Sequence, residues 1–423
     1  MAFKKADILL PSFSNDSEKM KKWSVVACDQ YTSEPLYWEE VEGFTNGAKS
    51  TLNLTVPEIY LNDDDIEDRI KRTNLSMKEY IEENVFTEYK DSFIYVERTL
   101  RNGVKRLGII GMVDLEEYDY SQGSKTKIRA TEGTVVSRIP PRLKVRQDAP
   151  IELPHIMLLI DDEKCDIIEP NENIKDTFTK VYDFDLMQNS GHIAGYKMSD
   201  EASKVLSDKL NALSDIDAFN KKYGVNEASP LVYAMGDGNH SLATAKANYE
   251  NLKKEIGEEK AKNTPARYAL CELVNLHDKS LVFEAIHRVI FNASGEEFLK
   301  ALETEYDVSY DESAKGQSFV FVYGGETKKV TVTNPTEYLT VATVQKMLDS
   351  FVASVSGEID YIHGEDVVLN LCEDKNNFGI ILDAMDKADL YKSVILDGAL
   401  PRKTFSMGDA CDKRFYTEAR KIK

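Results

Sequence analysis

Strand, turn and helix signals follow one another without a gap between residues 230 and 256, and this segment constrains the fold most. The apolar run LVYAM comes directly after Pro230, a Gly-Asp-Gly turn occupies 236–238, and a helical stretch begins at Asn239. Apolar runs bounded by turn residues are typical of buried strands, and Asn is a preferred capping residue at helix starts. The segment therefore predicts a strand that passes through a tight turn into a helix ending near Ile256.

Other patterns add antiparallel pairing. DSFIYVERTL and KRLGIIGMVDLEEY flank the turn signal at 101–103, and FVFVYGG and KKVTVTN repeat this hairpin pattern within 319–334. IELPHIMLLIDD, 151–162, predicts a buried strand that ends in an acidic loop, and LVFEAIHRVIF, 281–291, predicts one further strand. Apolar residues at helical spacing within 200–224 predict one or two amphipathic helices. The expected fold class is α+β, or mixed α/β, with antiparallel hairpins.

A chain of 423 residues exceeds one ordinary hydrophobic core. We expect an N-terminal α+β domain over 1–225, which contains an arginine-rich segment, and a C-terminal α/β domain over 226–423, which carries the Gly-Asp-Gly turn. In the last hundred residues, VATVQKMLDSFV has a helical pattern and SVILDGAL the pattern of a short strand.

The net charge limits the kinds of ligand to expect, and the cysteine content indicates the compartment. Lys and Arg total 53 against 73 Asp and Glu, which gives a net charge of −20. This field repels a phosphate backbone, so we expect no nucleic-acid partner, and a small phosphate ligand needs a local cluster of basic groups. Five cysteines without a CxxC pair fit a reducing compartment, and no signal or membrane segment is recognisable, so a cytoplasmic location is expected. The sequence gives no signal for an oligomeric state.

The turn at 236–241 has the residues of an anion-binding site. A helix start leaves about four N–H groups without intrahelical partners and carries about half a positive charge. We expect Gly236, Gly238, Asn239 and Ser241 to bind phosphate, and Asp237 and His240 to be catalytic candidates. A neutral imidazole suits a helix start better than a charged one. An ordinary capped helix without a ligand explains the same residues about equally well.

An arginine-rich segment, IRATEGTVVSRIPPRLKVR at 128–146, is a second candidate. Arg129, Arg138, Arg142 and Arg146 gather there within an acidic protein, and guanidinium groups bind phosphate through paired hydrogen bonds. Glu132 in the same stretch is a candidate general base or metal-binding carboxylate. The alternative is that the arginines alternate along a strand, face solvent and pair with surface acids.

Two further segments carry basic groups. His287-Arg288 and Arg402-Lys403 are candidate phosphate contacts, although a structural His-Arg pair and a solvated surface explain them equally simply. The polar and aromatic stretch CDQYTSEPLYW, 28–38, is expected to be a loop that lines a pocket, and Cys28 has no recognisable histidine partner as a nucleophile.

Several cofactor classes have no signal. No HxH, HExxH or Cys/His set predicts zinc, and nothing predicts haem or flavin. Walker, Rossmann and nucleophile-elbow motifs are missing as well. ATP or ADP with Mg²⁺ held by carboxylates and phosphate oxygens stays as the expected cofactor pair.

With these segments in hand, the chain resembles domain-of-unknown-function family 1015 (DUF1015) of bacteria and archaea over nearly its whole length. The motifs that carry the resemblance are ACDQYTSEP at 27–35, Arg-x-Thr-Glu-x-Thr at 129–134, GDGNHSLATAK at 236–246, IHR at 286–288 and LPRKTFSMGDACDKRFYTEARKI at 400–422.

The resemblance implies a role for the glycine turn. In that family the turn usually looks like Asp-Gly-His-His-Arg and is similar to the phosphate-binding turn of ParB and sulfiredoxin-like folds, including ParB-like free serine kinases. Asp237, Gly238 and His240 match this pattern, whereas Asn239 stands where the first His is expected and Ser241 where the Arg is expected. Another basic residue, such as Lys246 or Arg288, is then needed at the phosphate, or the ligand differs.

Three hypotheses follow. The first is a nucleotide-dependent phosphotransferase acting on a small hydroxyl substrate, with serine as the guess that the resemblance implies. The second is a nucleotide- or metabolite-sensing protein without turnover. The third is a structural or interaction protein in which the turn is only a helix cap.

Overall fold

The computed structural model describes residues 1–26, 31, 34–61, 63–121, 123–153 and 155–423. They form two compact units, each discontinuous in sequence. The first unit comprises residues 1–130, 134–281 and 409–423, and the second comprises 131–133 and 282–408.

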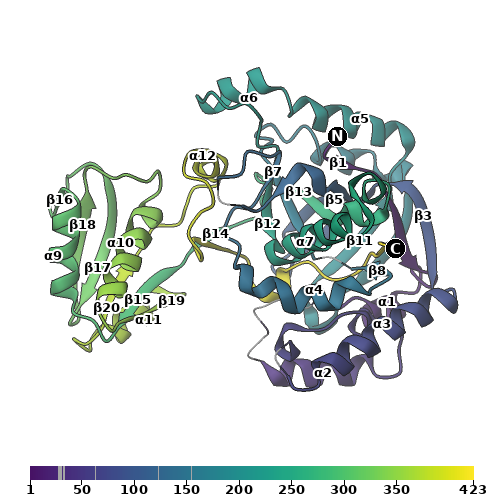
Figure 1. The fold of residues 1–423 in the computed structure, drawn as a ribbon, viewed down its shortest axis with the longest axis horizontal. Helices are drawn as coiled ribbons and strands as arrows, with labels where there is room; N and C mark the ends of the chain where they lie inside the picture. The colour runs from purple at the N-terminus through teal and green to yellow at the C-terminus, as the bar shows by residue number, and fades with distance from the viewer. Residues whose placement is uncertain (27–30, 32–33, 62, 122, 154) are drawn as a thin grey trace. The chain divides into compact units, whose positions relative to one another are not determined.

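The first unit is built on a ten-stranded mixed sheet (Figure 1). Its strand order is β10-β11-β4-β5-β13-β9-β12-β7-β6, and β1 also pairs with β5. The strands are β1 Phe3–Lys4, β4 Ile94–Thr99, β5 Lys105–Asp114, β6 Tyr118–Asp119, β7 Ile128–Arg129, β9 Met157–Ile160, β10 Thr179–Asp185, β11 His192–Lys197, β12 Tyr233–Asp237 and β13 Tyr268–Asn275. Pairing is antiparallel from β10 to β13, parallel between β13 and β9, and antiparallel between β9 and β12. The mixed α/β class with antiparallel hairpins is thereby confirmed.

Both faces of this sheet are covered, and the burial of successive residues in β4 shows it. Ile94 and Val96 pack into one hydrophobic cluster, and Tyr95 packs into the other. Successive side chains of a strand point to opposite faces. The hairpin expected around 101–103 joins β4 and β5, with Gly103 at φ +81°.

Helices and two small ribbons complete the first unit. The ribbons are β2 Ala6–Pro11 with β3 Phe86–Ser92 and β8 Ile151–Glu152 with β22 Arg420–Lys421. The helices are α1 Ser17–Trp23, α2 Pro35–Thr45, α3 Ile66–Glu82, α4 Ile139–Gln147, α5 Asp200–Ala212, α6 Ile216–Tyr223, α7 Asn239–Ile256 and α8 Glu258–Ala261. Helices α5 and α6 confirm the amphipathic helices expected at 200–224, and Gly224 ends α6 in the left-handed conformation.

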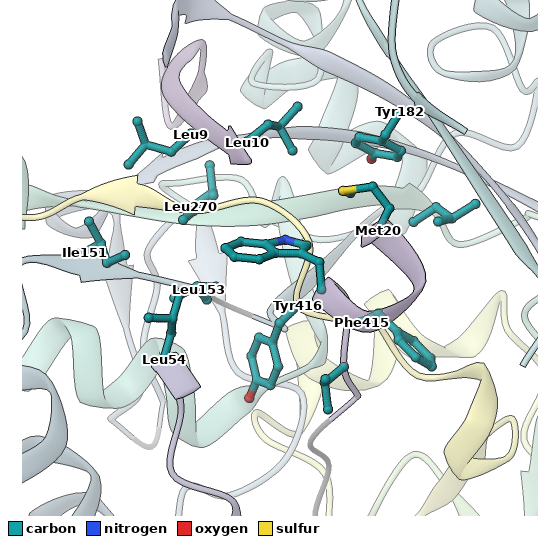
Figure 2. Packing of buried hydrophobic residues seen from close by; sticks show 14 of the residues in the cluster. Leu9, Leu10, Met20, Leu54, Ile151, Leu153, Tyr182, Leu270, Phe415 and Tyr416 are labelled. Carbon is teal, nitrogen blue, oxygen red and sulfur yellow. The ribbon is translucent and has the colours of Figure 1, made fainter. Parts of the chain in front are cut away.

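The 409–423 segment is an integral part of the first unit. Tyr416 N–H donates to the carbonyl of Val25, and Ala419 and Leu9 exchange backbone hydrogen bonds. Figure 2 shows Phe415 and Tyr416 within the hydrophobic cluster. The segment therefore adds side chains to the core of the unit.

The second unit holds a six-stranded antiparallel sheet in the order β16-β18-β17-β20-β15-β19, and a two-stranded ribbon of β14 with β21. Its strands are β14 Phe283–Ala285, β15 His287–Phe291, β16 Val308–Ser309, β17 Gln317–Tyr323, β18 Glu326–Val332, β19 Glu358–Ile362, β20 Phe378–Ile381 and β21 Phe405–Met407. Its helices are α9 Gly295–Glu305, α10 Thr340–Ser354, α11 Glu365–Leu371 and α12 Asp389–Leu396. The hairpin expected at 319–334 and the helix expected at VATVQKMLDSFV are confirmed as β17–β18 and α10.

Several expectations about the fold differ from the structure. The stretch 281–291 is not one strand, because the chain leaves the β14 ribbon and enters the six-stranded sheet at Ile286. SVILDGAL is not a strand, since its first residues lie in α12, whose buried side chains recur at helical spacing. The two units also divide the chain elsewhere than after residue 225, because β12 pairs with β9 in the sheet of the first unit.

No helix in the part of the chain that the structure describes combines the length and apolar character needed to span a bilayer.

Candidate functional site

The expected strand, turn and helix form at 233–256. Strand β12 continues through Gly236 and Asp237, Gly238 is the N-cap, and α7 begins at Asn239. Gly238 has φ +77°, and a Cβ atom there would lie 2.9 Å from the Cα atom of Ile156. Glycine is therefore required at this position both by the left-handed conformation and by the close approach of the neighbouring chain.

Asp237 is held at the turn as a carboxylate. One oxygen, Oδ1, accepts a hydrogen bond of 2.8 Å from the Gly238 N–H, and Oδ2 lies 3.4 Å from Lys413 Nζ. Burial raises the pKa of Asp237, but the Lys413 ammonium, the nearby His155 and the Gly238 N–H hold it below its ordinary value. Asp237 thus suits holding or orienting a hydroxyl group better than storing a proton.

A cavity of about 160 Å³ lies beside the first two turns of α7. Helix α7 contributes Ser241 and Thr244 to its wall, and helix α4, which packs against α7, contributes Arg142 and Arg146. The remaining polar wall includes His155. The cavity therefore brings Ser241 together with two arginines of the arginine-rich segment.

Tyr416 also belongs to the polar wall of this cavity, together with Thr55, Glu58 and Glu152. Its hydroxyl lies 3.1 Å from His155 Nδ1, and the two rings meet edge to face at 5.6 Å. Figure 2 shows Tyr416 on the same side of the hydrophobic cluster as the apolar wall residues Leu54 and Leu153. A phenol and an imidazole in contact provide a pair of groups that exchange hydrogen-bond donor and acceptor roles.

The two cavity arginines are charge-paired. Arg142 Nη2 bonds to Glu58 Oε1, and Arg146 Nη2 lies 2.5 Å from Glu152 Oε2. Burial raises the pKa of Glu152, but Arg420 and Arg146 outweigh it and hold the pKa below its ordinary value. The guanidinium groups therefore keep fixed positions at the wall, with part of their charge already balanced.

From Ile139 onward the arginine-rich segment is helix α4, and only Ile128 and Arg129 at its start lie in a strand. Pro140 and Pro141 occupy the first turn of α4, where a missing N–H costs no hydrogen bond. Arg138, Arg142 and Arg146 recur every four residues and so share one side of the chain. Arg138, just before α4, is exposed and does not line the cavity; its carbonyl accepts from Arg142 Nη1 at 2.7 Å.

Arg129 has a different environment. It is buried in β7 and donates to the carbonyls of Thr126 and Ser229 at 2.8 and 3.1 Å. Burial lowers its pKa. These hydrogen bonds link two chain segments of the first unit, and the expected role of Arg129 as a phosphate contact stays a prediction.

His287 and Arg288 of the second unit are buried. His287 Nδ1 accepts from the Leu382 N–H at 3.3 Å, and burial lowers the pKa of the imidazole. Arg288 donates to Gln345 Oε1 at 3.1 Å and to the Lys403 carbonyl at 3.0 Å, and burial lowers its pKa to about 10. Both side chains thus contact other residues of the second unit, and their expected role as phosphate contacts stays a prediction.

Glu132, Arg402 and Lys403 also lie in the second unit. Glu132 forms a β-bridge with Leu400. Arg402 is exposed and its Nε donates to Tyr361 Oη at 2.8 Å, and Lys403 is exposed with φ +57°. Their expected functional roles stay predictions.

Part of the stretch 28–38, including the candidate nucleophile Cys28, lies outside the described residues. From Pro35 onward the chain is helix α2 rather than a loop. The ring of Tyr31 stacks on Tyr37 at 3.7 Å.

The sequence profile of the family described as "Protein of unknown function (DUF1015)" matches residues 11–351, which is most of the chain. The chain belongs to the DUF1015 family. No curated protein matches it.

Three solved structures are similar to this DUF1015 protein at low identity. A free serine kinase in complex with AMP has a TM-score of 0.39 and 11% identity, over 74% of this chain and 90% of that chain. SbnI with C-terminal truncation from Staphylococcus aureus has a TM-score of 0.37 and 9% identity, over 71% and 82%. A conserved hypothetical protein from Pyrococcus furiosus has a TM-score of 0.36 and 12% identity, over 70% and 89%.

Three residues of the DUF1015 protein's site were missed by sequence reasoning: His155, Lys413 and Tyr416. They contact the turn or the cavity from segments far from residue 237 in sequence. The last motif of the family resemblance, at 400–422, contains Lys413 and Tyr416, and it was the sequence signal that could have identified these two residues. With Ser241 and the α4 arginines, His155 and Tyr416 give the cavity hydroxyl, imidazole and guanidinium donors, and the same wall holds the Glu58 and Glu152 carboxylates that pair with the arginines. Such a set suits a small polar ligand.

Proposed function

We propose that this DUF1015 protein binds the phosphate groups of a nucleotide at the start of α7 and transfers a phosphoryl group to a small hydroxyl compound, with a serine-like amino acid as the first substrate to test. The observation that carries the proposal is the cavity in which Ser241 of α7 meets Arg142 and Arg146 of α4. A helix start and guanidinium groups both favour phosphate oxygens.

The volume of the cavity sets a limit on what it encloses. Cavities of about 150 Å³ hold molecules the size of benzene, so about 160 Å³ accepts a phosphate group or a three-carbon amino acid. A second cavity of about 310 Å³ shares Thr55 and Val56 in its wall and also carries Tyr60 and Arg69. A nucleotide is therefore expected to extend beyond the first cavity, with its phosphate end at α7.

The residues have separate roles in this reaction. The left-handed Gly238 turns the chain from β12 into α7, and Asn239, His240 and Ser241 form the first turn of that helix, whose N-terminal end favours phosphate. Phosphoryl transfer depends mainly on positioning and on neutralising charge. An ionised Asp237 suits the task of orienting the attacking hydroxyl, and Mg²⁺ that enters with the nucleotide would supply further positive charge.

Calorimetry with ADP and with ATP plus Mg²⁺ tests binding, and phosphorus NMR with ATP and serine tests transfer. Ser241→Ala and Asp237→Asn should weaken nucleotide binding or abolish transfer. Lys346→Ala, at an exposed lysine of the second unit that pairs with Glu337, is the control that should leave both unchanged. Absence of binding to the wild-type protein, or binding that both site variants leave intact, contradicts the proposal.

A sensing protein without turnover is the second candidate. Its supporting observation is that the pKa of Asp237 is lowered, which makes this carboxylate a weak proton acceptor. Saturable ADP binding together with no phosphorylated product from serine or other small hydroxyl compounds would favour sensing over transfer.

A further inference from the structure

The 409–423 segment brings two side chains to the candidate site. Tyr416 forms part of the cavity wall, and Lys413 pairs with Asp237 at the turn. In sequence both residues lie more than 170 positions after the turn. The segment therefore supplies side chains to the candidate site as well as to the core.

Lys413 is held in a fixed place by its neighbours. Arg98 Nη2 donates to the Cys411 carbonyl and Arg106 Nη1 to the Asp412 carbonyl, each at 3.0 Å. On the other side of Lys413, Arg414 is buried and lies 2.7 Å from Glu418. The backbone on both sides of Lys413 is thus anchored by buried charged groups.

The Lys413 side chain is only 14% exposed and points to the turn. Its Nζ lies 3.4 Å from Asp237 Oδ2, which is longer than a short charge-assisted hydrogen bond of about 2.8 Å. An ammonium group has three donors. The long contact leaves donor capacity for a second oxygen at the same place.

Other basic groups of the first unit near the site are more firmly engaged. Lys246 Nζ donates to the Leu115 carbonyl at 2.8 Å and pairs with Glu250 at 2.9 Å. Arg142 and Arg146 pair closely with Glu58 and Glu152. Lys246, expected from the sequence as a substitute cation, is therefore directed to other partners.

We propose that Lys413 is a phosphate-binding residue of the 236–241 turn, and that the 409–423 segment is consequently part of the ligand site. This inference rests on the proposed function, because it names the cation that meets the phosphate there. Asp237 and Lys413 together form a neutral pair, so an arriving anion meets no net negative charge from the carboxylate.

Lys413→Met tests the inference in the full-length chain, since it keeps most of the side-chain length and removes the charge. The probes are ADP, and pyrophosphate as a ligand without base or sugar, both measured by calorimetry. The dissociation constants of both should rise about tenfold, which corresponds to about 1.4 kcal/mol. Lys413→Arg should keep both within about threefold of the wild-type protein.

Lys421→Met is the matched control, because Lys421 belongs to the same segment but pairs with Glu88 at an exposed site. It should bind both probes as the wild-type protein does. Thermal unfolding without ligand separates a folding defect from a binding defect, and Lys413→Met should unfold within about 2 °C of Lys421→Met.

The outcomes separate two kinds of failure. If the wild-type protein binds the probes and Lys413→Met binds them equally well, Lys413 is not a phosphate ligand and the proposed function stands. A loss confined to ADP, with pyrophosphate unaffected, also overturns the inference, because the lysine would then act on another part of the nucleotide. If the wild-type protein binds neither probe, the proposed function itself is wrong.

Discussion

Replacing Gly238 by alanine puts a methyl group against the backbone of Ile156. The new Cβ would lie 2.9 Å from the Ile156 Cα atom, a distance that requires the chain to shift. Gly238 is left-handed, with φ +77°, and this conformation costs a non-glycine residue about 1–2 kcal/mol. Alanine also restricts the unfolded chain, which offsets roughly 0.5 kcal/mol of that cost. Overpacking adds about 1–3 kcal/mol. The free energy of unfolding should therefore fall by about 2–4 kcal/mol.

Gly224 provides a control for the conformational part of this cost. It is also left-handed, with φ +68°, but an added Cβ would meet no atom within 4 Å among the described residues. Gly224→Ala should therefore cost only about 1 kcal/mol. The difference between the two variants measures the contact between the turn and Ile156.

Tryptophan fluorescence during urea unfolding is the suitable assay. The two tryptophans of the chain, Trp23 and Trp38, are both buried in the first unit, so their emission follows the unit that contains both glycines. Equal losses for Gly238→Ala and Gly224→Ala would refute the argument that close packing at 156 fixes the start of α7. A wild-type midpoint for Gly238→Ala would refute the turn geometry itself.

Two further predictions concern buried charges. Glu152→Gln should lower the free energy of unfolding by about 3–5 kcal/mol at pH 7, because it leaves Arg146 and Arg420 without their shared carboxylate. The pKa of Glu152 is lower in the folded than in the unfolded state, so its ionised carboxylate contributes fully to the free energy of unfolding above the unfolded-state value of about 4.3. This contribution is lost as the pH falls through the folded-state pKa. Urea titrations from pH 7 to 3 should therefore show the stabilities of wild type and variant converging. Arg288→Ala should destabilise the second unit by about 2–4 kcal/mol, whereas the exposed Arg402→Ala should change its stability by less than about 0.5 kcal/mol, measured by hydrogen exchange in β15.

Local sequence signals predicted the elements around the turn well. The run 233–237, the glycine at 238 and the helix to 256 lie where Pro230, the Gly-Asp-Gly turn and Asn239 indicated. These signals work because conformational limits of glycine and capping preferences act over a few residues. The same local reasoning failed at SVIL in α12, where burial of Tyr391 and Val394 on one helical face outweighs the strand preference of β-branched residues.

The site itself needed the three-dimensional structure. Ser241 was selected from the glycine turn at a helix start and the arginines from their clustering in sequence. Their meeting in one cavity depends on the packing of α4 against α7. Lys413 and Tyr416 reach the site only because the 409–423 segment returns to the first unit after the whole second unit. No periodicity within a short window contains that information. Arg288, also selected as a ligand candidate, is buried in the second unit and donates to Gln345 and to the Lys403 carbonyl, contacts that no local pattern in the sequence indicates.

The discontinuity of the first unit has a consequence for biosynthesis. A ribosome makes residues 1–281, then the whole second unit, and only then the residues that carry Arg414, Tyr416 and Arg420 into the first unit. Until the last segment is made, Glu272 lacks its partner Arg414 and Glu152 lacks its partner Arg420. The core of the nascent first unit therefore stays incomplete, and accessible to chaperones and proteases, while roughly 140 further residues are made at about 5–20 residues per second. Chains released before residue 409 are expected to lack Tyr416 in the cavity wall and a stable core in the first unit, so translation that stops early should yield a product that is degraded.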